Sequence, residues 1–345
     1  MAGYNNAGLP LQCKSTTLLV AILTACLCKP AAAHHSPAAY DTSKEITITG
    51  TIRDVSWGNP HIYIMLDVAD GDDGQTKRVR VEAGSSSTVR PLGVSGSDFP
   101  IGEVIQVRGF ASRRGSEAVM GLDVTNASGA ILPLHIRGRV KAAEPIAKAT
   151  ELSGKWISET SSFLAYLASM PKWPYTEAMA RALADRDTQL AAQADCTPAG
   201  PPASVLLPTL IEIETNNDAV VMNIDWMDSH RTIRLNSTHP SEIAPTLFGD
   251  AIGTWDGETL VIDTIGFTDD PEGMAPGRPT SAQKHLIERL TLNPDGTSLQ
   301  YDVTMEDPVY LKQPVTHSGR WLYRPDAVVS GEPCDDTVAK EFLKY

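Results

Sequence analysis

Short segments in which apolar and polar residues alternate recur along most of this chain, and tight-turn sequences separate them. Residues 46–52 (ITITGTI) and 286–292 (LIERLTL) are two such segments, and Asp256-Gly257 and Asn293-Pro-Asp-Gly296 are typical of hairpin turns. Alternation with a period of two is the pattern of a half-buried strand rather than of a helix. We therefore predict a fold that is mainly β, built from antiparallel hairpins.

The first block of predicted elements lies within residues 34–136. In chain order it holds three strands, a short helix and a further strand segment, at 46–52, 62–68, 77–81, 85–92 and 104–110. Strand character resumes at 104–110, and we expect two strands after the helix. Three strands, a helix and two more strands are the order of an OB-like five-stranded barrel, which we predict for this block. OB barrels that bind oligonucleotides need a basic stripe with aromatic residues, and we find none here. The formal net charge of −13 also argues against a nucleic-acid partner.

The second block of predicted strands begins after a stretch without strand pattern, residues 137–151, which we interpret as a linker. The block covers 152–345 and contains a helical insertion within 159–194, strongest at 175–194. Its clearest predicted strands are 219–227, 231–236, 259–267, 285–292, 299–305 and 319–323. A Gly-x-Trp opening followed by antiparallel hairpins favours a lipocalin-like β-barrel, a fold that can hold one small ligand.

The N-terminus has the pattern of an export signal. Lys14 precedes the apolar run 17–28, and Ala31-Ala32-Ala33 supplies a cleavage site, so residues 1–33 are predicted to be a signal peptide. The expected location is the periplasm or cell envelope of a bacterium. An alternative is the lipobox-like sequence 23–26, which predicts an acylated Cys26 and an outer-membrane lipoprotein. No other apolar run is long enough to predict a membrane span.

The cysteines follow the same division. Cys13, Cys26 and Cys28 lie in the predicted signal peptide, so the mature chain keeps Cys196 and Cys334. Two cysteines in an oxidising compartment most simply form one disulfide.

Histidines near the predicted cleavage site suggest a metal site. Cleavage after Ala33 leaves His34 as the first residue, and its amine and imidazole, with His35 or His61, form a nitrogen ligand set suited to Cu(II). The arrangement resembles the histidine brace of copper monooxygenases. The alternative is an unstructured start of the chain. Copper is the only cofactor that the sequence suggests, and otherwise none is expected.

Acidic residues on predicted barrel strands are the candidate catalytic groups. Glu288 shares a strand face with three leucines of 286–292, and burial inside the barrel raises the pKa of a carboxyl group towards the range useful for proton transfer. The other catalytic candidates are Asp225, Asp263, His285 and Tyr301. Candidate ligand-binding residues are Trp226, His230, Trp255 and Arg320. The alternative interpretation is structural, with Glu288 paired across strands to Arg231, Arg234 or Arg320.

Two sets of motifs resemble uncharacterised families of exported bacterial proteins. The motifs of the first part are Ala33-His-His-Ser36, Gly50-Thr51, Trp57, Asn59-Pro-His61 and Gly102. Those of the second part, which resemble a separate family, are Gly249-Asp250, Gly253-x-Trp255-Asp-Gly257, Thr259–Thr264, His285-Leu-x-Glu-Arg289 and Glu306-Asp-Pro308, flanked by Cys196-x-Pro198 and Cys334. The resemblance implies two fused modules and carries over no reaction.

The expected function is therefore that of a cell-envelope protein that binds a small, largely apolar molecule in its C-terminal barrel. One alternative is a cofactor-free isomerase, lyase or cyclase in which Glu288 moves a proton. The other is periplasmic copper binding through the N-terminal histidine.

Overall fold

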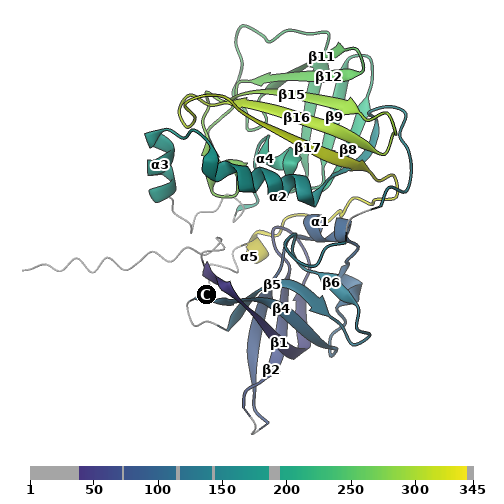
Figure 1. The fold of residues 1–345 in the computed structure, drawn as a ribbon, viewed down its shortest axis with the longest axis vertical. Coiled ribbons are helices and arrows are strands. Elements are labelled where there is room, and N and C mark those ends of the chain that lie inside the picture. The colour runs from purple at the N-terminus through teal and green to yellow at the C-terminus, as the bar shows by residue number, and fades with distance from the viewer. Residues whose placement is uncertain (1–38, 72–73, 114–116, 142–143, 186–194, 340–345) are drawn as a thin grey trace, which may run out of the picture. The chain divides into compact units, whose positions relative to one another are not determined.

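The computed structural model describes residues 39–71, 74–113, 117–141, 144–185 and 195–339 (Figure 1). Within these ranges the chain is mainly β and forms two closed barrels in succession, as the alternating pattern predicts. None of the helices in the described part of the chain is both long and apolar enough to cross a membrane.

The first barrel has the connectivity of an OB fold. Its strands are β1 (Tyr40–Ser56), β2 (Tyr63–Ala69), β3 (Thr76–Glu82), β4 (Val104–Ser112) and β5 (Ala118–Thr125). They follow the order β3-β2-β1-β4-β5, a parallel pairing of β3 with β5 closes the barrel, and β6 (Ile131–Pro133) adds to β5. The short helix α1 (Ser86–Val89) separates β3 from β4, at the position that the sequence predicts. This confirms the expected OB-like barrel.

Local chemistry explains two features of this barrel. Ser85 caps α1, because its hydroxyl accepts a hydrogen bond from the amide of Thr88 at 3.2 Å. At Gly109, where the register of β4 against β5 shifts, a Cβ atom would lie 2.2 Å from the carbonyl oxygen of Met120. Only glycine fits this close approach of two strands.

The second barrel closes with nine strands. They are β7 (Gly154–Ser158), β8 (Leu210–Thr215), β9 (Ala219–Ile224), β10 (Ser229–Leu235), β11 (Asp250–Asp256), β12 (Thr259–Ile265), β15 (His285–Leu292), β16 (Ser298–Glu306) and β17 (Val315–Tyr323). All neighbouring pairs are antiparallel except β10 and β11. An odd number of strands cannot close with antiparallel pairs alone, and the long connection 236–249 makes the parallel pair feasible.

Short elements accompany the second barrel. They are α2 (Thr160–Ser169), α3 (Glu177–Ala184), α4 (Ala203–Leu206) and the hairpin of β13 (Asp270–Ala275) with β14 (Arg278–Thr280). The short helix α5 (Asp336–Ala339) follows Cys334 and Asp335, which contact Asn59. The predicted helical insertion is present as α2 and α3, and its part at 186–194 lies outside the described residues. Cys196 and Cys334 form the predicted disulfide, with their Cα atoms 5.7 Å apart.

Large side chains occupy the interior of the second barrel. Trp156, Tyr301 and Trp321 are fully buried, and the rings of Tyr301 and Trp321 stack with centroids 4.9 Å apart. Barrels of about this size either fill their interior with side chains or hold one small ligand there, and in this barrel large side chains take up the interior. A ligand of the second barrel is therefore better sought at an end or a wall than on the axis.

Candidate functional site

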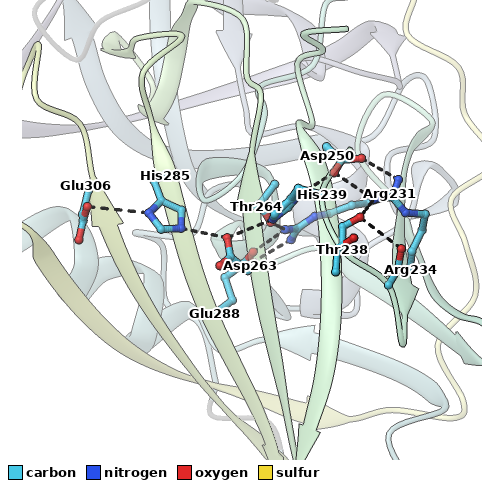
Figure 2. A network of polar contacts seen from close by, with 11 residues as sticks. Arg231, Arg234, Thr238, His239, Asp250, Asp263, Thr264, His285, Glu288 and Glu306 are labelled. Atoms are coloured by element: carbon cyan, nitrogen blue, oxygen red, sulfur yellow. Dashed lines mark hydrogen bonds and ion pairs between the residues drawn. The ribbon is translucent and has the colours of Figure 1, made fainter. Parts of the chain in front are cut away.

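A buried ion pair crosses the inside of the second barrel. The alternation of β12 and β15 turns Thr264 and Glu288 inward, and Arg231 of β10 reaches both of them (Figure 2). The guanidinium of Arg231 donates to the two oxygens of Glu288 at 2.9 and 2.5 Å and to the hydroxyl of Thr264 at 2.6 Å. The hydroxyl of Tyr301 donates to Glu288 at 2.9 Å. We call these four residues the inner cluster.

The electrostatics of the inner cluster are those of a paired charge. The side chains of Arg231 and Glu288 are each only 1% exposed. Burial opposes the charge on Arg231, but the nearby carboxylate of Glu288 outweighs it and raises the pKa of the guanidinium. Burial, and then Glu288, raise the pKa of Tyr301 well above its usual value. The inner cluster therefore has the geometry of the structural alternative, with Arg231 as the partner of Glu288.

The other two arginines considered as partners of Glu288 form different ion pairs. Arg234 pairs with Asp250 through two hydrogen bonds of 2.8 and 3.0 Å. Arg320 pairs with Glu159 through bonds of 2.9 and 2.6 Å.

A second polar network follows the outer face of the same strands. Its members, which we call the outer strip, are Arg234, His239, Asp250, Asp263, His285 and Glu306 (Figure 2). Imidazole and carboxylate groups alternate along it. The Oδ1 atom of Asp263 lies at hydrogen-bond distance, 2.9 Å, from Nε2 of His285. It lies 3.4 Å from Nε2 of His239, which is an ion-pair distance without a hydrogen bond.

The ends of the outer strip differ in exposure and in contacts. Nδ1 of His239 lies 2.6 Å from Oδ2 of Asp250, whereas Nδ1 of His285 lies 3.8 Å from Oε2 of Glu306. Burial acts to raise the pKa of Asp250, but hydrogen bonds from His239 and Arg234 outweigh it and lower this pKa. At one end of the strip, Arg234 compensates the charge of Asp250, whose side chain is mostly buried. At the other end, the side chain of His285 is half-exposed.

The structure separates the candidate catalytic residues into two groups. β12 turns Leu260, Ile262 and Thr264 inward and leaves Asp263 outside. His285 and Glu288 lie three positions apart on β15, which puts them on opposite faces of the strand. Glu288 stays together with Tyr301, and His285 with Asp263, so one ligand cannot contact both pairs.

Asp225 lies at a separate place, where β9 turns into β10. Its carboxylate accepts from the amide and the hydroxyl of Ser330 at 2.9 and 2.7 Å. Burial raises the pKa of Asp225 in spite of these bonds. Met227 and Asp228 in the turn have φ angles of 51° and 52°, in the left-handed region that side chains other than glycine seldom occupy.

A cavity of about 370 Å³ adjoins this turn. We call it the hairpin cavity, and its lining includes Leu210, Ile224, Asp225, Met227, His230 and Val329. It brings together Asp225 and His230, two residues that the sequence singles out. It combines an apolar floor with polar groups, which is the usual composition of a small-molecule site.

The remaining predicted ligand-binding residues lie elsewhere. Trp226 is buried next to the cavity but does not line it, Trp255 is 44% exposed on β11, and Arg320 is engaged by Glu159. The structure therefore does not bring these three residues to one site.

The predicted copper ligands are only partly described. His34 and His35 lie outside the described residues. Nδ1 of His61 lies 3.1 Å from the carbonyl oxygen of Ala83. Within the described ranges, no group of three or more His, Cys, Asp or Glu side chains is arranged to hold a metal ion.

Four members of the two networks were not among the sequence candidates. His239 lies in the connection 236–249, which has no periodic pattern, and Asp250, Thr264 and Glu306 were noted only as parts of motifs. Their contacts in the networks join residues from different segments of the chain, so the spacing of residues within one segment does not predict these contacts. The nearest available signal was the Gly249-Asp250 motif itself.

Comparisons with known proteins cover the first barrel best. Residues 22–122 match the model of a family described as being of unknown function, DUF6152. This agrees with the expected resemblance of the first part to an uncharacterised family. No curated protein matches the sequence. Among solved structures, a mitochondrial single-stranded DNA binding protein from S. cerevisiae matches with 14% identity, over 24% of this chain and 93% of that chain. Its TM-score of 0.20 is too low to support an argument.

Proposed function

We propose that this protein binds a small molecule and that the hairpin cavity is the binding site. The observation that carries the proposal is the cavity itself, because about 370 Å³ lies within the range of about 300–1,000 Å³ typical of ligand pockets. Leu210, Ile224 and Met227 offer apolar contacts, while Asp225 and His230 offer polar ones. A largely apolar molecule with one polar group fits this lining.

The state of the barrel interior supports a site at its end. Trp156, Tyr301 and Trp321 occupy the interior, and the inner cluster satisfies its own charges. A ligand on the axis would have to displace these packed groups. A ligand in the hairpin cavity contacts the turn between β9 and β10, the neighbouring ends of β8 and β9, Asn59 and the chain segment that contains Val329.

We further infer export to the cell envelope. The signal-like sequence at 1–33 motivates this inference, and the disulfide supports it because such bonds persist in oxidising compartments. The motifs of the second part support a fused module from a separate exported family. Acylation at Cys26 and copper binding at His34 depend on which cleavage site is used, and the mass of the exported chain distinguishes them.

A cavity-filling substitution tests the binding site. Val329 lines the hairpin cavity and is 46% exposed, so Val329→Trp puts an indole into the cavity without disturbing the core. Val328→Trp is the matched control, because Val328 is 75% exposed and does not line the cavity. The neutral fluorescent probe N-phenyl-1-naphthylamine should bind saturably to the parent chain and to the control. We expect Val329→Trp to weaken its binding by about tenfold or more, since a filled cavity loses its apolar contacts. Equal binding by all three proteins, or no saturable binding by the parent chain, contradicts the proposal.

A second candidate function has its own supporting observation. Asp263 lies 2.9 Å from Nε2 of half-exposed His285, and a carboxylate that orients an imidazole is a common arrangement for general acid–base catalysis. If the protein is an isomerase, lyase or cyclase, this pair is better placed than Glu288 to move the proton. His285→Gln should then reduce turnover by about 10²-fold or more, whereas turnover that survives this change excludes the pair.

A further inference from the structure

The charges around the hairpin cavity identify a class of ligand. We infer that the cavity binds a small organic cation, an ammonium group attached to a short apolar or aromatic body. This inference rests on the proposed function, because it assigns the chemistry of the same site.

The first argument is the state of Asp225. Both of its hydrogen-bond donors come from Ser330, and both are neutral. None of the ion pairs found among the described residues includes Asp225. Arg90 acts on Asp225 from beyond ion-pair distance and is itself paired with Glu332, so among the described residues no cation contacts the Asp225 carboxylate. A partly buried carboxylate without such a contact is costly, and burial raises its pKa. A ligand cation beside it would offset that cost.

The second argument is the charge of the remaining lining. Two further carboxylates, Asp228 and Glu332, line the cavity, and none of the lining residues that the structure describes is a lysine or an arginine. Glu332 pairs with Arg90, so its charge is already compensated. Asp228 is exposed on the turn, and among the described lining residues His230 alone carries a basic side chain. The cavity wall therefore favours a cation and disfavours an anion.

The third argument is the apolar part of the lining. Leu210 and Ile224 are buried core residues whose side chains reach the cavity, and Met227 adds a flexible, polarisable thioether. Met227 and Asp228 hold left-handed backbone conformations that cost free energy, and such strain is concentrated at functional sites. These surfaces suit an aryl or alkyl body whose charged end points to Asp225.

The test compares three probes of similar size on the full mature chain. Benzylamine is protonated at neutral pH, benzyl alcohol is its neutral analogue, and benzoate is an anion. Calorimetric titration should show benzylammonium binding at least about tenfold more tightly than benzyl alcohol, with benzoate weakest. This comparison within the parent protein needs no variant and so does not depend on the folding of one.

Two substitutions then locate the preference. In Asp225→Asn the amide can still accept from and donate to Ser330, and the preference for the ammonium over the alcohol should disappear. Glu214→Gln on β8 removes an exposed carboxylate outside the cavity and should leave the preference unchanged. Melting curves of both variants show whether the fold is retained.

The outcomes separate this inference from the proposed function. If N-phenyl-1-naphthylamine binds in the cavity but benzylammonium and benzyl alcohol bind equally, the inferred ligand class is wrong and the binding site stands. If neither the naphthylamine nor benzylammonium binds, both are wrong. A preference for the ammonium that persists in Asp225→Asn also overturns the inference.

Discussion

Removal of Arg231 is expected to destabilise the second barrel strongly. The substitution Arg231→Met keeps an unbranched side chain of similar length but leaves Glu288 buried, at 1% exposure, without its cation. Glu288 then keeps only the hydroxyl of Tyr301 as a hydrogen-bond donor among the contacts of the inner cluster. Breaking a buried ion pair in this way typically costs about 3–5 kcal/mol of unfolding free energy.

A matched exposed ion pair is formed by Arg289, the residue that follows Glu288 on β15. Arg289 donates to Asp256 at 2.8 Å, and their side chains are 44% and 70% exposed. Exposed pairs contribute about 0–1 kcal/mol, so Arg289→Met should cost far less than Arg231→Met. Each arginine pairs with one carboxylate, and Arg231 also donates to Thr264, so the comparison sets a buried, fully bonded arginine against an exposed one.

Urea denaturation followed by tryptophan fluorescence measures both effects, since Trp156 and Trp321 lie in the barrel interior. The double variant Arg231→Met/Glu288→Leu should recover much of the lost stability, because an apolar pair can replace a buried ion pair. A loss of less than about 1 kcal/mol in Arg231→Met would refute the assignment of the inner cluster as a structural ion pair.

Three further predictions follow from the packing and charge of other residues. Gly109→Ala should destabilise the first barrel by about 1–3 kcal/mol in thermal melts, because its Cβ meets the Met120 carbonyl, whereas Gly58→Ala, with open space around it, should not. Cys196→Ser should lower stability by up to about 5 kcal/mol, since the bond closes a sequence separation of 138, and added reductant should have no further effect on this variant. Lys284 is buried, its ammonium donates to the Pro201 carbonyl at 2.6 Å, and burial lowers its pKa to about 8. Between a pH of about 8 and the usual lysine pKa, the folded chain therefore binds fewer protons at Lys284 than the unfolded chain does. The contribution of Lys284 to the free energy of unfolding rises with pH across that interval. Lys284→Met should remove this rise from the measured pH dependence of stability.

Local patterns predicted the elements of the fold well. Alternation places β15 at 285–292, as observed, and the succession of strands and a helix in the first part is enough to identify the OB-like barrel. Both inferences depend on period and order, which a sequence carries directly. The parallel pairing of β10 with β11 was not predicted, because it depends on closure of the whole barrel.

The sites were harder to predict than the elements. Alternation shows that Asp263 and Thr264 point to opposite faces of a strand, but it does not say which face is inside. Glu288, which shares its strand face with three leucines, lies inside the barrel, whereas Asp263, which shares its face with Val261 and Ile265, lies outside. The contact of Asp225 with Ser330 joins residues more than a hundred positions apart, and no spacing rule reaches that far.

The most direct test of the binding site is a crystal structure with 4-bromobenzylamine, whose bromine can be located by anomalous scattering. We predict one bromine peak in the hairpin cavity, beside Leu210 and Ile224, with the ammonium group within hydrogen-bond distance of Asp225. An empty hairpin cavity at saturating ligand, or a bromine bound only elsewhere, would contradict the proposed site.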